Sequence, residues 1–126
     1  MRRLLVVLPF LVLFVTAASA QSLPADKQQV LDEAQALQPT VEELSMALWD
    51  YSETALRENQ SADRLASELE QHGFTIERGV ADMPTAFVAS YGSGRPIIGI
   101  LAEFDALPGV GNKAAPQQTP REDGKT

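Results

Sequence analysis

The chain of 126 residues contains no cysteine, one histidine and no glycine before residue 73. Without cysteine, these residues hold no disulfide framework, no thiolate nucleophile and no cysteine-ligated zinc site. His72 alone cannot assemble a histidine-rich metal site. Basic residues are scarce, with ten lysines and arginines against seventeen acidic residues and a net charge of −7. This balance argues against a nucleic-acid-binding protein, because phosphate neutralisation requires clustered basic side chains.

The first twenty residues have the pattern of a secretory signal peptide. Arg2 and Arg3 precede an apolar run over residues 4–15, and the small residues 18–20 form an Ala-Ser-Ala cleavage site. We therefore expect cleavage after Ala20 and a periplasmic or secreted protein with no membrane attachment afterwards. The alternative is a membrane anchor, but a span needs about 20 apolar residues and this run is shorter.

Residues 21–72 contain no glycine and carry one apolar seam, which indicates helix. The apolar positions recur at alternating spacings of three and four. Pro39 interrupts them, so we expect a kink there or a helix that restarts at Pro39. The seam packs on its own domain or on a partner helix, and the break at proline favours its own domain. The seam consists of Val30, Ala34, Leu37, Val41, Leu44, Leu48, Tyr51 and Ala55.

A second helix is expected to start near Ser61, which is a good N-cap residue, and to end at Gly73. If Gly73 takes the left-handed conformation after the helix, Leu69 and Phe74 are the pair that meets in a Schellman motif. His72 then lies in the last turn, where the helix dipole favours a cation. A structural role for His72 is therefore expected in place of a catalytic one.

From Phe74 onward the apolar period changes to two. Residues 74–78 and 86–91 predict two strands, and residues 97–102 (Ile-Ile-Gly-Ile-Leu-Ala) predict a third strand with no polar side chain. A continuously apolar strand is typical of one buried on both faces. Two helices on one side cannot cover both faces, so we expect the chain to be part of a larger α/β sandwich.

Two carboxylates, Glu103 and Asp105, follow the third predicted strand. Ligands of open α/β sheets bind beyond the carboxyl ends of strands, and residues i and i+2 of an extended segment point the same way. Both carboxylates could therefore face one site, where they would ligate a metal, orient a metal-bound imidazole, or act as acid and base. The alternative is that they are solvated acids at a strand end.

Residues 101–108 (Leu-Ala-Glu-Phe-Asp-Ala-Leu-Pro) resemble the signature of the zinc-dependent amidohydrolase and metallopeptidase family, which includes p-aminobenzoyl-glutamate hydrolase, indoleacetyl-amino-acid hydrolases and aminoacylases. Residues 49–58 occupy the place of the family's helix junction, and residues 69–74 are similar to its helix-to-strand turn. The order and spacing of these segments, over roughly residues 40–112, carry the resemblance.

The resemblance implies an α/β fold, the N-terminal part of a three-layer αβα sandwich as in zinc exopeptidases, with two helical segments and then three strands. It also implies a metal-dependent hydrolase of amide bonds in N-acyl amino acids or small peptides, commonly a homodimer, with zinc or another divalent metal in the complete enzyme. Asp105 would be the carboxylate that orients a metal-bound histidine, and Glu103 a weak metal ligand or a structural acid.

The expected organisation is a signal peptide at 1–20, part of a catalytic domain at 21–108 and a flexible polar tail at 109–126. The family continues after this region into a Cys-Gly-His segment that bears metal ligands, which this sequence lacks. We therefore expect an N-terminal fragment that is inactive and binds no metal alone, and that exposes the apolar surface of residues 97–102. The alternative is a small exported, non-enzymatic module that binds a partner through its helical seam.

Overall fold

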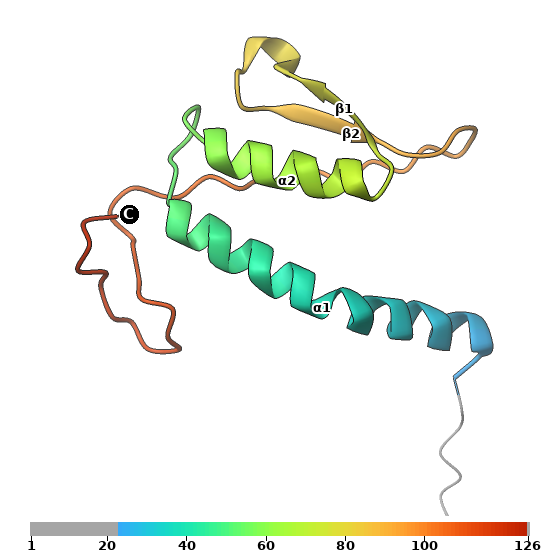
Figure 1. Ribbon diagram of the computed structural model, residues 1–126, viewed down its shortest axis with the longest axis horizontal. Coiled ribbons are helices and arrows are strands. Elements are labelled where there is room, and N and C mark those ends of the chain that lie inside the picture. Colours follow the sequence, from blue (N-terminus) through green and yellow to red (C-terminus); the bar gives the residue numbers. More distant parts are fainter. Residues whose placement is uncertain (1–22, 126) are drawn as a thin grey trace, which may run out of the picture.

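The computed structural model describes residues 23–125 (Figure 1), so the signal peptide expected at 1–20 lies outside the described residues. Two helices and a two-stranded antiparallel sheet make up the regular structure, which is compatible with part of an α/β fold. No helix within residues 23–125 is long and apolar enough to cross a membrane. The elements are α1 (Ala25–Tyr51), α2 (Asn59–Gln71), β1 (Thr75–Arg78), the 3₁₀ helix η1 (Val80–Asp82) and β2 (Phe87–Ser90).

Helix α1 runs through Pro39 as one element, so of the two expected alternatives the restart at that residue is wrong and the kink stays a prediction. The turn around Pro39 is exposed, and water can therefore satisfy the carbonyl that loses its N–H donor there. The amino-terminal half of the seam is also exposed, with 64% of Val30 and 60% of Val41 accessible. Only the last part of the seam, at Leu44, Leu48 and Tyr51, is half-buried, and Ala55 lies beyond the helix.

Helix α2 lies between α1 and the sheet and supplies the small core (Figure 1). Ala62 and Ala66 are 3% and 0% exposed, and Ser61 beside them is 1% exposed. The helix begins at Asn59, so Ser61 lies inside it and the expected cap at Ser61 is wrong. The reason is that the side chain of Glu53 reaches the first turn from outside the helix and caps it instead.

The end of α2 has the Schellman geometry predicted from the sequence. Gly73 has a φ of 86°, the Phe74 N–H donates to the Leu69 carbonyl at 3.0 Å, and the Gly73 N–H donates to the Glu70 carbonyl at 2.9 Å. His72 lies in the turn at this end and its Nε2 is 3.4 Å from a carboxylate oxygen of Glu68 on the preceding turn. The prediction for this helix end is confirmed.

The first two predicted strands are confirmed, although each is slightly shorter than predicted. β1 and β2 pair in an antiparallel register that sets Thr75 opposite Ser90 and Arg78 opposite Phe87. At the end of the sheet next to α2, the rings of Phe74 and Tyr91 lie 5.2 Å apart.

The third predicted strand is not formed within the described residues. Residues 97–102 have no regular secondary structure, and they are not buried on either face: Ile97, Ile98, Ile100 and Leu101 are 79%, 83%, 91% and 93% exposed. A strand needs a neighbour for its backbone hydrogen bonds, and the two strands within residues 23–125 pair only with each other. The apolar side chains of this segment are therefore exposed, as expected.

Candidate functional site

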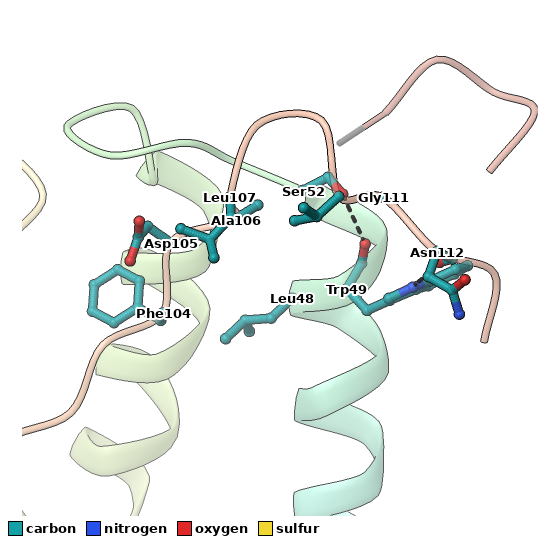
Figure 2. Close-up of a pocket in the computed structure, with 10 residues that line it drawn as sticks. Leu48, Trp49, Ser52, Phe104, Asp105, Ala106, Leu107, Gly111 and Asn112 are labelled. Atoms are coloured by element: carbon teal, nitrogen blue, oxygen red, sulfur yellow. Dashed lines mark hydrogen bonds between the residues drawn. The ribbon is translucent and has the colours of Figure 1, made fainter. Parts of the chain in front are cut away.

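A pocket of about 330 Å³ lies between the carboxyl-terminal end of α1 and the segment 104–112 (Figure 2). The backbone N–H of Ala106 donates to the carbonyl of Glu53 at 2.7 Å, which ties this segment to the connection between α1 and α2. Phe104 stacks on Phe87 of β2 with ring centroids 6.0 Å apart. The pocket is lined by Leu48, Trp49, Ser52, Phe104, Asp105, Ala106, Leu107, Val110, Gly111 and Asn112.

Of the two predicted site residues, only Asp105 lines this pocket. Its side chain is half-buried, whereas Glu103 is exposed and is not part of the lining. Because residues 97–105 do not form a strand, the rule that places residues i and i+2 on one side does not apply here. The structure therefore does not bring the two carboxylates together in the pocket.

The residues around Asp105 do not form a complete zinc centre by themselves. Within residues 23–125, no group of three or more histidine, cysteine, aspartate or glutamate side chains is close enough to hold a metal ion. A zinc site generally has three or four protein ligands. The described donors therefore do not fit zinc alone, and no chemical step through a metal follows from them.

Glu53 forms a polar cluster that no sequence motif indicated. Its carboxylate accepts the backbone N–H of Ser61 at 2.8 Å, the Ser61 hydroxyl at 2.9 Å and the backbone N–H of Gln60 at 3.1 Å. Burial raises the pKa of Glu53, but these hydrogen bonds outweigh it and hold the pKa below its ordinary value. The Glu53 side chain therefore caps the first turn of α2 from outside the helix, whose N-cap residue is Glu58. The same residue accepts the Ala106 N–H through its backbone carbonyl and so holds the segment 104–112 in place.

Glu58 forms a second buried polar pair. It is 8% exposed, and its Oε2 accepts the hydroxyl of Thr85 at 2.6 Å. Burial raises the pKa of Glu58, whereas the hydrogen bond from Thr85 and nearby backbone N–H groups lower it, with a net pKa below the ordinary value. This pair joins the start of α2 to the turn that precedes β2.

Residues 109–125 contain no helix or strand but fold back onto the end of α1 (Figure 1). The indole N–H of Trp49 donates to the carbonyl of Asn112 at 2.8 Å, and Arg121 lies over the Trp49 ring. No pattern in the sequence indicated this contact, because its partners lie far apart along the chain. The domain boundary expected between residues 108 and 109 stays a prediction.

The chain is similar to a p-aminobenzoyl-glutamate hydrolase subunit of Escherichia coli (strain K12). The two are 47% identical over an alignment of 81 residues, and 61% of this chain is covered. The chain spans 17% of the length of that relative. No family model matches the chain, and no solved structure matches it. The similarity supports a relationship to amidohydrolases, in agreement with the motifs at residues 49–58, 69–74 and 101–108.

Proposed function

We propose that this chain forms part of a hydrolase of amide bonds in N-acyl amino acids or small peptides, with p-aminobenzoyl-glutamate as the first substrate to test. The observation that carries the proposal is the 47% identity over 81 residues to a p-aminobenzoyl-glutamate hydrolase subunit. The motif at residues 101–108 adds support because it contains Asp105, which lines the pocket.

The proposed architecture is a three-layer αβα sandwich in which residues 97–102 form an inner strand. The exposure of Ile97, Ile98, Ile100 and Leu101 supports it. Burying such a side chain contributes about 1.5 to 3 kcal/mol, so the four together would add roughly 6 to 12 kcal/mol. Additional strands from outside the described residues would bury this surface and satisfy its backbone.

In the proposed enzyme, Asp105 is a positioning residue. Asp105 is a lining residue of the pocket, and its carboxylate points away from Ser52 and Asn112 (Figure 2). There it would accept a hydrogen bond from a histidine ring N–H and so fix the orientation and basicity of that ring. Glu103 is exposed and would be a weak ligand or a structural acid. Zinc, or another divalent metal, would take its remaining donors from beyond residues 23–125.

The proposed location is the periplasm or the extracellular space, after removal of residues 1–20. Amino-terminal sequencing of the exported protein would then begin at Gln21. The proposed assembly is a homodimer, as in the family that the motifs resemble, and light scattering of the purified protein measures it. Neither the described residues nor the comparisons favour the alternative of a non-enzymatic interaction module.

The test uses the product of the native gene, purified with its intact mass measured, with divalent metal supplied. It should release p-aminobenzoate from p-aminobenzoyl-glutamate, and Asp105→Asn should lower kcat by about 10- to 100-fold, as expected for a carboxylate that supports a metal ligand. Asp26→Asn, in the first turn of α1 and distant from the pocket, is the matched control and should leave kcat unchanged. Absence of amide hydrolysis by the intact product would overturn the proposal.

A further inference from the structure

Helix α1 lacks a cation of its own at its carboxyl-terminal end. Its last turn contains no basic residue, although this end carries the negative pole of the helix dipole. The last carbonyls of a helix also have no backbone partner within the helix. Ser52 provides hydrogen-bond donors for two of these carbonyls. Its backbone N–H donates to the Leu48 carbonyl at 3.0 Å, and its hydroxyl donates to the Trp49 carbonyl at 3.2 Å (Figure 2).

Two cations more than 70 residues away in sequence supply further donors. Arg121 Nη1 donates to the Trp49 carbonyl at 2.7 Å, and Lys125 Nζ donates to the Asp50 carbonyl at 2.6 Å. The guanidinium carbon of Arg121 also lies 3.9 Å from the centre of the Trp49 ring, within cation–π distance. The Arg121 side chain is only 4% exposed, so this contact excludes water.

Carboxylates surround the same two cations. Arg121 pairs with Asp123 through a short contact and approaches Asp50 at 3.6 Å, while Lys125 is 3.0 Å from Asp50. Hydrogen bonding to Asp123 raises the pKa of Arg121, so its charge is permanent at any physiological pH. Two positive and two negative groups therefore alternate around the end of α1.

The segment that carries these cations also supplies part of one wall of the pocket, at residues other than the cations themselves. Gly111 and Asn112 line the pocket, and Gly111 accepts the backbone N–H of Arg121 at 3.2 Å. Asn112 accepts the Trp49 indole N–H through its carbonyl and bridges to Pro120. The segment 111–125, here called the strap, is thus doubled back on itself and fixed to α1 at both of its ends.

We propose that the strap is a charge-held latch, in which Arg121 and Lys125 bind the carboxyl-terminal end of α1, and that its release opens the pocket wall at Gly111 and Asn112. Arg121 and Trp49 are positioning residues for the pocket in this arrangement. The proposal does not depend on the hydrolase function, since it rests only on contacts within the described residues.

The fluorescence of Trp49 tests the latch directly, because Trp49 is the single tryptophan of the chain. The Debye length falls from about 10 Å at 0.1 M salt to about 3 Å at 1 M, so high salt weakens the exposed Lys125–Asp50 pair most and the pairs of the buried Arg121 side chain less. In the full chain, we expect high salt to shift the Trp49 emission to longer wavelength and to increase quenching by acrylamide. Far-UV circular dichroism should stay constant over the same range.

Arg121→Ala should produce this red shift at low salt and remove most of the salt response. The loss of its charge-assisted hydrogen bonds should raise the ratio of open to closed strap by about tenfold. Arg121→Lys keeps the positive charge but loses the planar guanidinium group with its several N–H donors. Its Trp49 emission should therefore lie between those of the wild-type chain and Arg121→Ala. Lys113→Ala is the control, since Lys113 pairs with Glu122 inside the strap and not with α1.

The latch is overturned if Trp49 emission and quenching in the wild-type chain do not respond to salt. It is also overturned if Lys113→Ala reproduces the change seen in Arg121→Ala, because the effect would then come from general loosening of the strap. Should Arg121→Ala fail to fold, which circular dichroism reports, the salt titration of the wild-type chain decides alone.

Discussion

Replacing Glu53 by alanine should destabilise the start of α2 more than any exposed substitution on the same chain. The Glu53 carboxylate accepts two backbone N–H groups from the first turn of α2, at Gln60 and Ser61, over 3.1 and 2.8 Å. It also accepts the Ser61 hydroxyl at 2.9 Å, and Ser61 is 1% exposed. Removal of the carboxylate leaves a buried hydroxyl and two helix N–H groups without their partner.

The magnitude follows from these contacts. Loss of an N-cap acceptor costs about 1 kcal/mol, and loss of a negative charge at a helix amino terminus costs about 0.3 to 1 kcal/mol. With the stranded Ser61 hydroxyl included, Glu53→Ala should cost about 2 kcal/mol. For a domain of this size, that lowers the unfolding midpoint by roughly 10 °C. Glu53→Gln keeps an acceptor oxygen and loses the charge, so about 1 kcal/mol is expected.

The pH dependence provides a second check. Burial raises the pKa of Glu53 and its hydrogen bonds lower it by more, so the folded-state pKa lies below the ordinary value of 4.5. A carboxyl with a depressed pKa stabilises the fold fully above its unfolded value and loses that contribution as the pH falls through the folded value. Stability should therefore decrease below about pH 4.5 in the wild-type chain, and less steeply in Glu53→Ala.

Thermal unfolding followed by far-UV circular dichroism measures both effects. Glu77→Gln is the matched control, since Glu77 is an exposed glutamate on β1 and should leave the midpoint unchanged. If Glu53→Ala unfolds at the wild-type temperature, Glu53 does not cap α2 in solution, and its role in fixing the connection between the two helices is refuted.

Three further outcomes are expected. Thr85→Val removes the 2.6 Å hydrogen bond to the buried Glu58 carboxylate and should cost about 2 kcal/mol in denaturant unfolding; an unchanged midpoint would show that water replaces the hydroxyl. Gly73→Ala forces a side chain to a φ of 86° and should cost about 1 kcal/mol in the same measurement, with an unchanged slope against denaturant; a more stable variant would refute the left-handed turn. Hydrogen bonding to the strap guanidinium lowers the pKa of Asp123 to about 2, so this contribution to the latch is complete above its ordinary 3.8 and is lost as the pH falls through about 2. Because Asp50 also faces Arg121 and Lys125, the acid titration of Trp49 emission is compared with that of Asp123→Asn. The difference between the two should appear only well below pH 3.8, and a difference that appears earlier would contradict this ion pair.

The features that the sequence predicted correctly depend on short stretches of chain. The end of α2 is fixed by Leu69, Gly73 and Phe74, because glycine tolerates the left-handed conformation and the Phe74 N–H donates to the Leu69 carbonyl. The two strands follow from alternation over four or five residues. For the same reason, the sequence located the segment around Asp105, which the structure places in a pocket.

The features that the sequence missed depend on partners distant along the chain. Residues 97–102 have the composition of a buried strand, but composition cannot provide a neighbouring strand, and they are exposed. Ser61 has the right chemistry for an N-cap, yet Glu53 occupies that role from eight residues upstream. Glu103 follows the same apolar segment as Asp105 but does not line the pocket.

By itself, the sequence determined the end of α2, the two paired strands and the motifs that resemble those of amide hydrolases, because turns, helix ends and motif spacing are properties of consecutive residues. Only the tertiary structure decided that Arg121 lies on Trp49, that Asp105 and Glu103 separate, and that the apolar segment stays exposed. Those outcomes are set by which distant groups come within a few ångströms of each other, and that depends on how the whole chain packs.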